Sequence, residues 1–373
     1  MTLRQCEGYT LTGQKCRKKI PAGQRYCTIH NRAVEIGIPP YVNITPKDNF
    51  WLFVPMGQPR WRVGSSATTI FKCLLTKHSY SLDKYVSEGT YGVVYFATDR
   101  ETKTQVAIKA TKEIFHKYDP VEYDFYKEYI MHNVIRDRVQ GGSEYIVNMI
   151  EAFFIKTVSG LHGCIAMEMM DGDLDNLFDR FASIKHIEVL RFYILACNFI
   201  ANALMRLHSC NIFHLDIKPG NILWKRNAGN GRGFSLRLVD FGLGCYYGGH
   251  SKLPHRATGT YLPPEWRKNG NKYKPTYKEV NDPKEMRMGE TYAMAVTFYK
   301  MFKRISSSLY SRNQQIRRLA ELINISMSED IRLRSTVSIE NFANFTSDLL
   351  NDMDSALPNM EETLNEILPT IKN

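Results

Sequence analysis

Two short polar stretches in the second half of the sequence constrain its fold more than any other feature. The first covers residues 214–221 and reads His-Leu-Asp-Ile-Lys-Pro-Gly-Asn, and the second covers residues 239–242 and reads Val-Asp-Phe-Gly. They supply two carboxylates, a lysine and a carboxamide, with Asp240 placed 24 positions after Asp216. Because phosphoryl transfer spreads negative charge over non-bridging oxygens, such a set can hold metal-bound phosphates beside a hydroxyl nucleophile.

The two stretches resemble the catalytic motifs of the eukaryotic protein-kinase family. By this resemblance, Asp216 orients the substrate hydroxyl and accepts its proton, and Lys218 lies over the transferring phosphoryl group. Asn221 and Asp240 supply oxygen ligands to Mg²⁺, a hard cation that prefers them. A lysine two positions after the aspartate is typical of serine/threonine kinases. The plainer interpretation is a solvated turn and a strand end, but the order and spacing of the two motifs disfavour it.

The resemblance implies an α+β, bilobal protein-kinase fold with a small β-rich N-lobe and a larger helical C-lobe. It covers residues 80–350, with the N-lobe at 80–168, the C-lobe at 171–350, and a C-terminal helical tail at 351–373. It also implies ATP and Mg²⁺ as cofactors and proteins with serine or threonine hydroxyls as substrates. We therefore expect the γ-phosphoryl group of ATP to be transferred to such hydroxyls.

The length and composition are those of a globular protein. A chain of 373 residues predicts two or three domains, and its 43% hydrophobic content suffices for a sizeable core. No run of eighteen apolar residues occurs, and the N-terminus lacks the apolar core of a signal peptide. The eight cysteines are too scattered for a disulfide-rich secreted scaffold. We therefore expect a soluble intracellular protein with reduced thiols and no membrane partner.

The chain is basic, with a formal net charge of +11 and a pI near 9.1. An excess of this size allows an acidic partner such as a nucleic acid, an acidic protein or a phosphorylated surface. The plainer interpretation is a solvated surface that is rich in lysine.

Residues 1–35 predict a small metal-binding module. Thiolates and imidazole are the ligands that zinc prefers, and four of them close a tetrahedral structural site. A segment so poor in apolar residues needs a metal to fold. The expected ligands are Cys6, Cys16, Cys27 and His30. The alternative is three unrelated reduced cysteines and a surface histidine.

This module resembles short Cys-His modules in proteins of large DNA viruses. The shared patterns are Thr-x-x-Gly-x-x-Cys, at residues 10–16, and Tyr-Cys-x-x-His, at residues 26–30. The resemblance implies a zinc knuckle and favours a viral kinase as the origin of the chain, which would place it in the host cytoplasm or the virion. Its basic side chains can contact phosphate backbones or an acidic protein, but no array of stacking aromatic residues accompanies them.

The segment 36–79 contains five prolines, which break regular structure, together with the aromatic run Phe50-Trp51-Leu52-Phe53. Disordered segments lack such aromatic residues, so we expect an extended brace that packs on the following domain. A recognition role for the aromatic side chains is the alternative.

A glycine-containing hairpin is expected after Tyr80. Glycines let backbone amides approach phosphate oxygens. The kinase family writes this loop Gly-x-Gly-x-x-Gly-x-Val, and here its positions are Ser87, Gly89, Gly92 and Val94, with serine in place of the first glycine. By resemblance this loop covers the phosphates of ATP.

The segment Val106-Ala107-Ile108-Lys109 matches the family's strand that ends in a lysine. The resemblance implies that Ala107 and Lys109 contact ATP, with Lys109 pairing with its α- and β-phosphates. A helix is expected to begin at Asp119-Pro120. Within it Glu128 is the best match to the glutamate that holds this lysine, and Glu122 is the second choice. A solvated carboxylate is the plainer interpretation of Glu128.

Residues 165–174 resemble the hinge that follows the small lobe. Met167 is then the gatekeeper, and the backbone of Glu168 and Met170 contacts adenine, although methionines here also fit ordinary core packing. Residues 186–208 predict a largely buried helix, and residues 225–235 predict a lengthened surface hairpin.

Three positions near the catalytic motifs depart from or adapt the family pattern. Glu265, in a segment similar to Tyr-x-Ala-Pro-Glu, is expected to pair with Arg334. Glu290 stands where the family has aspartate, so a longer carboxylate must reach the catalytic-loop backbone. Leu215 stands where the family has an arginine that meets a phosphate of the activation segment. We therefore expect activity that does not depend on phosphorylation of that segment.

Two other functions compete with an active enzyme. A pseudokinase would keep the fold as a binding scaffold, and Ser87, Leu215 and Glu290 support this interpretation. Retention of all four charged and polar catalytic positions argues against it, because a scaffold has no electrostatic need for them. The other alternative is an adaptor led by the zinc module, which binds nucleic acid or protein.

Overall fold

The computed structural model describes residues 3–5, 17–24, 52–56, 70–73, 79–88, 92–111, 124–157, 160–184, 186–226, 234–247, 251–252, 259–268, 270–275, 279–280, 282–309 and 313–354. The four predicted zinc ligands, the expected helix start at residues 119–120, Glu122, Gly89 and the tail from residue 355 lie outside these ranges. The chain forms two compact units. Unit 1 comprises residues 1–134 and 147–170, and unit 2 comprises residues 135–146 and 171–373.

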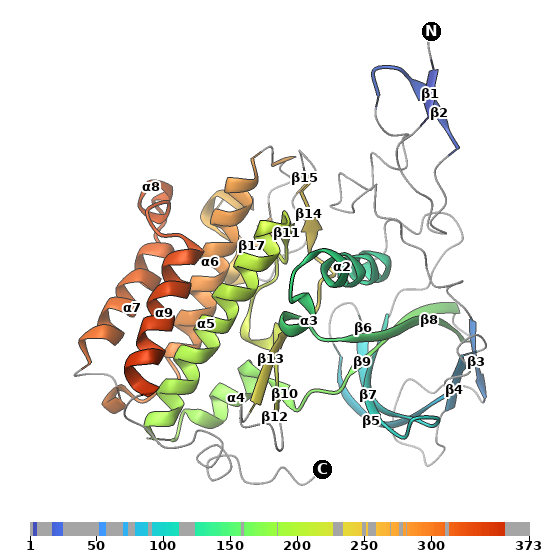
Figure 1. Cartoon of the computed structure of the whole chain (residues 1–373), viewed down its shortest axis with the longest axis horizontal. Coiled ribbons are helices and arrows are strands. Elements are labelled where there is room, and N and C mark those ends of the chain that lie inside the picture. Colours follow the sequence, from blue (N-terminus) through green and yellow to red (C-terminus); the bar gives the residue numbers. More distant parts are fainter. Residues whose placement is uncertain are drawn as a thin grey trace. The chain divides into compact units, whose positions relative to one another are not determined.

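Unit 1 is built on a closed β-barrel with the strand order β3-β4-β5-β6-β7-β9-β8 (Figure 1). All neighbours are antiparallel except β3 and β8, which pair in parallel and close the barrel. The strands are β3 Leu52–Met56, β4 Ile70–Cys73, β5 Ser79–Glu88, β6 Gly92–Asp99, β7 Gln105–Thr111, β8 Met149–Thr157 and β9 Gly160–Glu168. A short hairpin of β1 Leu3–Gln5 and β2 Lys19–Pro21 also belongs to unit 1.

Two strands of the barrel fall in the segment expected to be an extended brace. β3 and β4 pair with each other, β4 continues to β5, and β3 continues to β8. The described parts of residues 36–79 are therefore members of the sheet, and the barrel begins well before residue 80. One proline of this segment, Pro55, lies within the five-residue strand β3.

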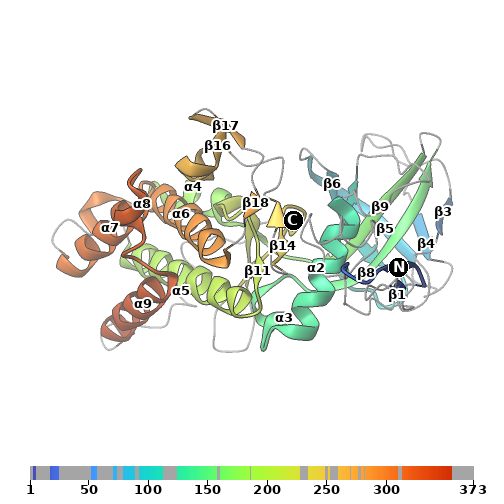
Figure 2. The same cartoon turned by 90° about the horizontal axis from the view of Figure 1, so that it is seen from above.

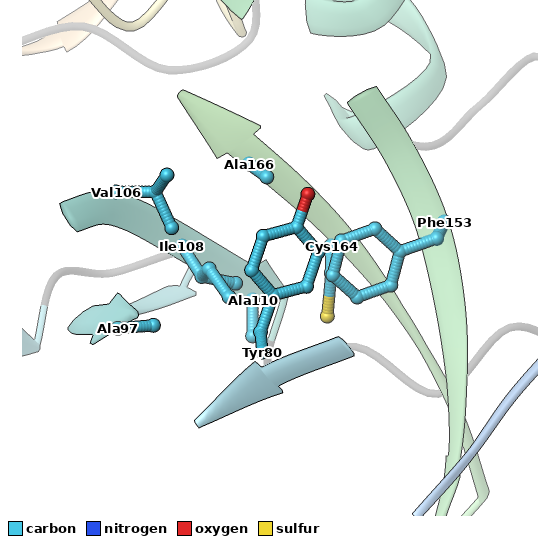
Figure 3. Packing of buried hydrophobic residues seen from close by; sticks show 8 residues of the cluster. All are labelled: Tyr80, Ala97, Val106, Ile108, Ala110, Phe153, Cys164 and Ala166. Carbon is cyan, nitrogen blue, oxygen red and sulfur yellow. The ribbon is translucent and has the colours of Figure 1, made fainter. Parts of the chain in front are cut away.

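The barrel interior is filled by alternate side chains of its strands (Figure 3). The rings of Tyr80 and Phe153 stack at 5.9 Å between centroids, and small or branched side chains surround them: Ala97, Val106, Ile108, Ala110, Cys164 and Ala166. Because successive residues of a strand point to opposite faces, the intervening residues lie on the outer face. The half-buried Val94, Ala107 and Lys109 are among them, and Val94 pairs directly with Lys109. The expected nucleotide contacts thus share one face of the sheet.

Unit 2 is mostly helical. Its helices are α3 Gly142–Tyr145, α4 Leu174–Phe181, α5 Ile187–Ser209, α6 Pro283–Phe302, α7 Gln314–Ser326, α8 Ile331–Arg334 and α9 Ile339–Asp354. Its three-stranded sheet consists of β10 Gly172–Asp173, β12 Ile222–Arg226 and β13 Phe234–Leu238. Its two-stranded sheets are β11 Ile212–Phe213 with β14 Cys245–Tyr246, β15 Ser251–Lys252 with β18 Glu279–Val280, and β16 Arg267–Lys268 with β17 Asn271–Pro275. Short 3₁₀ turns are η2 Pro219–Asn221, η3 Gly259–Tyr261, η4 Pro264–Trp266 and η5 Ser307–Leu309.

Helix α5 is the central helix of this unit and confirms the buried helix predicted over residues 186–208. It runs along α9 and α6 (Figure 1, Figure 2), where the Asn198 amide donates to the Ala343 carbonyl and the Tyr193 hydroxyl donates to that of Phe298. By length and composition alone, α5 is the one helix in the described part of the chain that could cross a membrane. Because 67% of its apolar stretch is buried inside the protein, α5 has the burial of a core helix.

Helix α2, Asp124–Arg138, crosses from unit 1 into unit 2, and the residues after it belong to unit 2. The ring of Tyr145 lies 5.9 Å from that of Phe199, and Ile146 forms a bridge to Leu238. The stretch 80–168 predicted as a continuous N-lobe is therefore interrupted at residues 135–146, because apolar contacts there attach this segment to the helical unit.

Helix α6 starts at a cap that the sequence encodes and packs tightly against η4. The Asp282 side chain accepts from the backbone amide of Lys284, and Pro283 occupies the first helical turn. At Gly289 the helix touches the buried indole of Trp266. A Cβ placed on Gly289 would lie 2.1–2.7 Å from three ring atoms of that indole.

We expect Gly289→Ala to destabilise unit 2 by about 1–3 kcal/mol, because the added methyl group overpacks the contact with Trp266. The gain in helix propensity from alanine, about 1 kcal/mol, offsets only part of this cost. Chemical denaturation of the full chain measures the effect. Gly23→Ala is the control, since a Cβ there meets no atom within 4 Å. Equal denaturation midpoints for Gly289→Ala and wild type would contradict the packing argument.

Candidate active site

The carboxylate of Asp216 is held by two neighbours on its own loop. The Lys218 ammonium lies 2.7 Å from Asp216 Oδ2, and the Asn221 amide nitrogen donates to the same oxygen at 2.9 Å and to the Asp216 carbonyl at 2.8 Å. Asp216 and Asn221 are buried, whereas the Lys218 side chain is 27% exposed. The loop therefore presents an oriented carboxylate with a cation beside it.

Glu290 on α6 accepts hydrogen bonds from the backbone of this loop. One oxygen of its buried carboxylate accepts from the amides of His214, at 2.7 Å, and Leu215, at 2.6 Å. The other oxygen contacts His208 Nε2 at 2.5 Å. Leu215 adopts a left-handed backbone with φ 61°, which costs a non-glycine residue about 1–2 kcal/mol. The prediction that the longer carboxylate reaches the loop backbone is thus confirmed, and its hydrogen bonds offset the strain.

His214 joins the two polar stretches. Its Nδ1 accepts from the Asp216 amide at 3.3 Å, and its Nε2 lies 3.0 Å from the Val239 carbonyl, which fits the tautomer with the proton on Nε2. The ring packs on Phe241, with 4.5 Å between centroids. The Val239 amide also donates to the Asn221 carbonyl. The second stretch is therefore anchored directly beside the first.

Two oxygen donors in unit 2 suit a magnesium ion. Both hydrogen bonds of the Asn221 carboxamide use its nitrogen, so the amide oxygen is the end that can bind a cation. Asp240, with φ 68°, contributes a carboxylate at the start of the neighbouring turn. Within the described ranges no three His, Cys, Asp or Glu residues gather as a metal group. A magnesium ion bound with nucleotide phosphates uses only one or two protein carboxylates, so this donor set fits it.

Unit 1 contains the expected lysine and glutamate pair. Lys109 Nζ on β7 lies 2.7 Å from Glu128 Oε2 on α2, and the two side chains are 15% and 4% exposed. The prediction that Glu128 holds this lysine is confirmed as a contact. A cation so well shielded from water is a strong binding group for phosphate oxygens.

The glycine hairpin is formed by β5 and β6, whose ends pair Ser87 with Val94. Gly92 lies where a Cβ would approach the Ala110 carbonyl oxygen at 2.6 Å. This close contact between β6 and β7 explains the glycine at position 92 by packing.

Comparison with known proteins agrees with this geometry. The model of the protein kinase domain family matches residues 80–367, more than half of the chain. The chain belongs to the protein kinase family.

Similar relatives include proteins named as a dual-specificity kinase, a serine/threonine-protein kinase and a cyclin-dependent kinase. Dual specificity tyrosine-phosphorylation-regulated kinase 2 of Drosophila melanogaster is 30% identical over 45% of this chain and 21% of its own length. Serine/threonine-protein kinase crk1 of Schizosaccharomyces pombe is 29% identical over 51% of both chains. Cyclin-dependent kinase 7 of Dictyostelium discoideum is 27% identical over 53% of this chain and 51% of its own. The match thus spans from a fifth to half of the length of these relatives. A protein kinase domain implies the use of ATP and Mg²⁺.

The residues predicted to form the hinge fall near the end of unit 1 in the sequence. Met167 and Met170 are buried, and the backbone amide of Glu168 already donates to the Asn148 carbonyl at 2.9 Å. The Glu168 side chain accepts from the Asn148 amide in return, at 2.8 Å. Unit 1 ends at Met170 and unit 2 resumes at Asp171.

The expected pair of Glu265 and Arg334 is confirmed, with Arg334 Nη2 donating to Glu265 Oε2. Arg334 is buried and also lies over the ring of Tyr292, 5.5 Å from its centroid. This contact ties η4 to α8 and is structural.

Several contacts of the kinase domain were not predicted from sequence. His208, the third partner of Glu290, belongs to none of the motifs. Its position near the end of the predicted helix α5 is the sequence feature that could have indicated this contact. The contact of Lys300 with Thr260 was also missed. These partners lie 82 and 40 positions apart, so only the fold brings them together.

Proposed function

We propose that this protein is an ATP-dependent serine/threonine protein kinase. The single observation that carries the proposal is the Asp216 carboxylate, held at 2.7 Å from the Lys218 ammonium and 2.9 Å from the Asn221 amide. The relative named as serine/threonine-protein kinase crk1 supports the choice of hydroxyl substrate, as does the lysine two positions after the aspartate.

Each residue has a distinct task in this mechanism. Bound ATP with Mg²⁺ supplies the γ-phosphoryl group and the cation that neutralises its charge. Asp216 orients the substrate hydroxyl and takes its proton, and Lys218 stabilises the negative charge that develops on the transferring group. Asn221 and Asp240 would hold the metal through oxygen atoms. By the family resemblance, Lys109, which Glu128 holds within unit 1, would bind the other phosphates.

The scaffold alternative loses one of its supports. Glu290 is one of the departures from the family pattern that favour a scaffold, yet its carboxylate accepts from two amides of the catalytic loop. Ser87 and Leu215 remain as departures from the family pattern. The retained polar set still favours an enzyme.

A direct assay tests the proposal. The full chain, incubated with ATP labelled on the γ-phosphate, is expected to phosphorylate a generic basic or acidic protein on serine or threonine. The transfer requires Mg²⁺ and stops when the metal is chelated. Thermal stabilisation by nucleotide without any transfer would refute the enzyme and support the scaffold.

We expect the activity to be independent of phosphorylation in the activation segment. Leu215 packs against an apolar cluster that includes Phe213, Leu262 and Trp266, and it offers no charge to a phosphate. Treatment with a phosphatase, and Ser251→Ala, are therefore expected to leave the rate within about a factor of two, since no charge-assisted contact is lost. Thr258→Ala and Thr260→Ala complete the series, although Thr260 also contacts Lys300. A large drop in the rate of Ser251→Ala, traced to a missing phosphate on Ser251, would contradict this expectation.

The N-terminal residues have a separate proposed role. Cys6, Cys16, Cys27 and His30 together offer the ligands of a structural zinc site, which supports a zinc knuckle. Its basic residues suit an acidic protein or a nucleic acid. Elemental analysis of the purified chain tests it, with one zinc per chain expected and no zinc contradicting the site. Cys164, Cys197, Cys210 and Cys245 are free thiols. The Cys-His patterns of residues 10–16 and 26–30 favour a viral origin.

A further inference from the structure

Several residues of helix α6 form hydrogen bonds with the backbone of the catalytic loop. Glu290 accepts from the amides of His214 and Leu215, and two turns later the Thr297 hydroxyl donates to the Ile217 carbonyl at 3.1 Å. Lys300 lies three residues after Thr297, about 4.5 Å further along the helix axis. Lys300 therefore lies about one helical turn beyond the contact between Thr297 and Ile217, the residue that follows Asp216.

At this place Lys300 is held by two residues of η3. Its ammonium donates to the Thr260 hydroxyl at 2.8 Å and lies 4.0 Å from the centroid of the Tyr261 ring. A hydroxyl and an aromatic face orient a cation without neutralising its charge. Thr260 is exposed and Lys300 and Tyr261 are half-buried, so the group is accessible from water.

The Tyr261 hydroxyl lies near several charged groups. Burial raises the pKa of its hydroxyl, and the carboxylates of Asp175 and Asp216 raise it further, while Arg304 opposes them. The influence of Asp216 means that Tyr261, and the ammonium above its ring, lie in the electrostatic neighbourhood of the catalytic aspartate.

The carboxylates near Lys300 form ion pairs with Arg304 rather than with Lys300. In the described part of unit 2, Lys300 has no carboxylate within ion-pair distance, whereas Arg304 pairs with Asp175 at 2.8 Å and with Asp179 at 3.1 Å. Burial lowers the pKa of Lys300, Asp175 opposes that shift and Arg304 adds to it. The nearby carboxylates are thus already engaged by the arginine, and Lys300 retains the capacity to bind an anion.

We propose that Lys300, oriented by Thr260 and Tyr261, forms a subsite for an anionic side chain of the protein substrate, close to the hydroxyl that accepts the phosphate. This inference rests on the proposed kinase activity and defines the substrate class. The anion is a carboxylate or a phosphate, since both accept hydrogen bonds from an ammonium.

Matched peptides test the subsite in the full chain. Each contains one serine acceptor and, at each flanking position in turn, aspartate, phosphoserine, alanine or arginine. At one position the wild type is expected to show a kcat/KM about tenfold higher for the anionic peptide than for the alanine peptide, the ratio that one charge-assisted hydrogen bond provides. The aspartate and phosphoserine arms distinguish the two sources of negative charge.

Substitution of the lysine assigns the preference to this residue. Lys300→Met is expected to reduce the ratio to near one, mostly through KM, and Lys300→Glu to reverse it in favour of the arginine peptide. Lys303→Met is the control, because Lys303 is exposed at the end of α6 and lies over Tyr299 instead, 5.4 Å from the ring centroid. It is expected to keep the wild-type ratio.

The outcomes separate the subsite from the enzyme. If the wild type phosphorylates neither peptides nor proteins, the proposed function fails. If it phosphorylates alanine and anionic peptides equally, or prefers arginine, the subsite alone is refuted. A preference for anions that survives in both Lys300→Met and Lys300→Glu would refute the assignment to Lys300.

Discussion

Asp216→Asn is expected to lower kcat by about 10²–10⁴-fold, the range that a positioned general base contributes, with little change in KM. Asparagine has nearly the same shape, so it can still accept from the Asn221 amide, but it cannot take the proton of a hydroxyl. Initial rates of labelled phosphate transfer measure the effect. Thermal stabilisation by nucleotide is expected to persist, which separates a lost chemical step from a lost fold.

Asp348→Asn is the matched control for that variant. Asp348 lies exposed on α9, and the same chemical change there is expected to leave the rate unaltered. A rate for Asp216→Asn within about threefold of wild type, a difference well below the range expected for a base, would contradict its role.

Glu290→Ala is expected to destabilise unit 2 by about 3–5 kcal/mol, because breaking a buried charged network leaves its partners without compensation. The amides of His214 and Leu215 lose their common acceptor, and His208 loses its carboxylate. Phosphate transfer is expected to fall as well, since the left-handed backbone of Leu215 is no longer held. Denaturation and initial rates measure the two effects.

A graded series shows whether the charge or the hydrogen bonds matter. Glu290→Gln keeps an oxygen for both amides and removes the charge, so its stability is expected to lie between wild type and Glu290→Ala. Glu321→Ala, at an exposed position of α7, controls for the loss of a helical glutamate. Denaturation of Glu290→Ala at the wild-type midpoint would show that the loop is held by other contacts.

The contacts that sequence predicted are those between motif positions. The pairs Lys109 with Glu128 and Glu265 with Arg334 form as expected, because each partner belongs to a pattern with a fixed place in the fold. The buried helix at α5 followed from its apolar periodicity. Local patterns thus predicted this helix and these two polar pairs.

Contacts between residues outside motifs could not be predicted in this way. Nothing in the neighbourhood of His208 or Lys300 in the sequence indicates a partner far along the chain. Strands β3 and β4 were missed for a similar reason, since their pairing with β8 and β5 is long-range and the prolines around them obscure an alternating pattern.

The parallel pairing of β3 with β8 sets where the catalytic portion of the chain can be cut. A fragment that starts at residue 80 follows the motifs but strips β3 and β4 away, leaving the backbone amides and carbonyls of β5 and β8 unpaired along two rims. Unpaired rims of this kind recruit strands from other molecules and promote aggregation. A fragment that begins before residue 52 keeps the ring of strands complete, so we expect β3 and β4 to keep such a fragment of the kinase domain monodisperse.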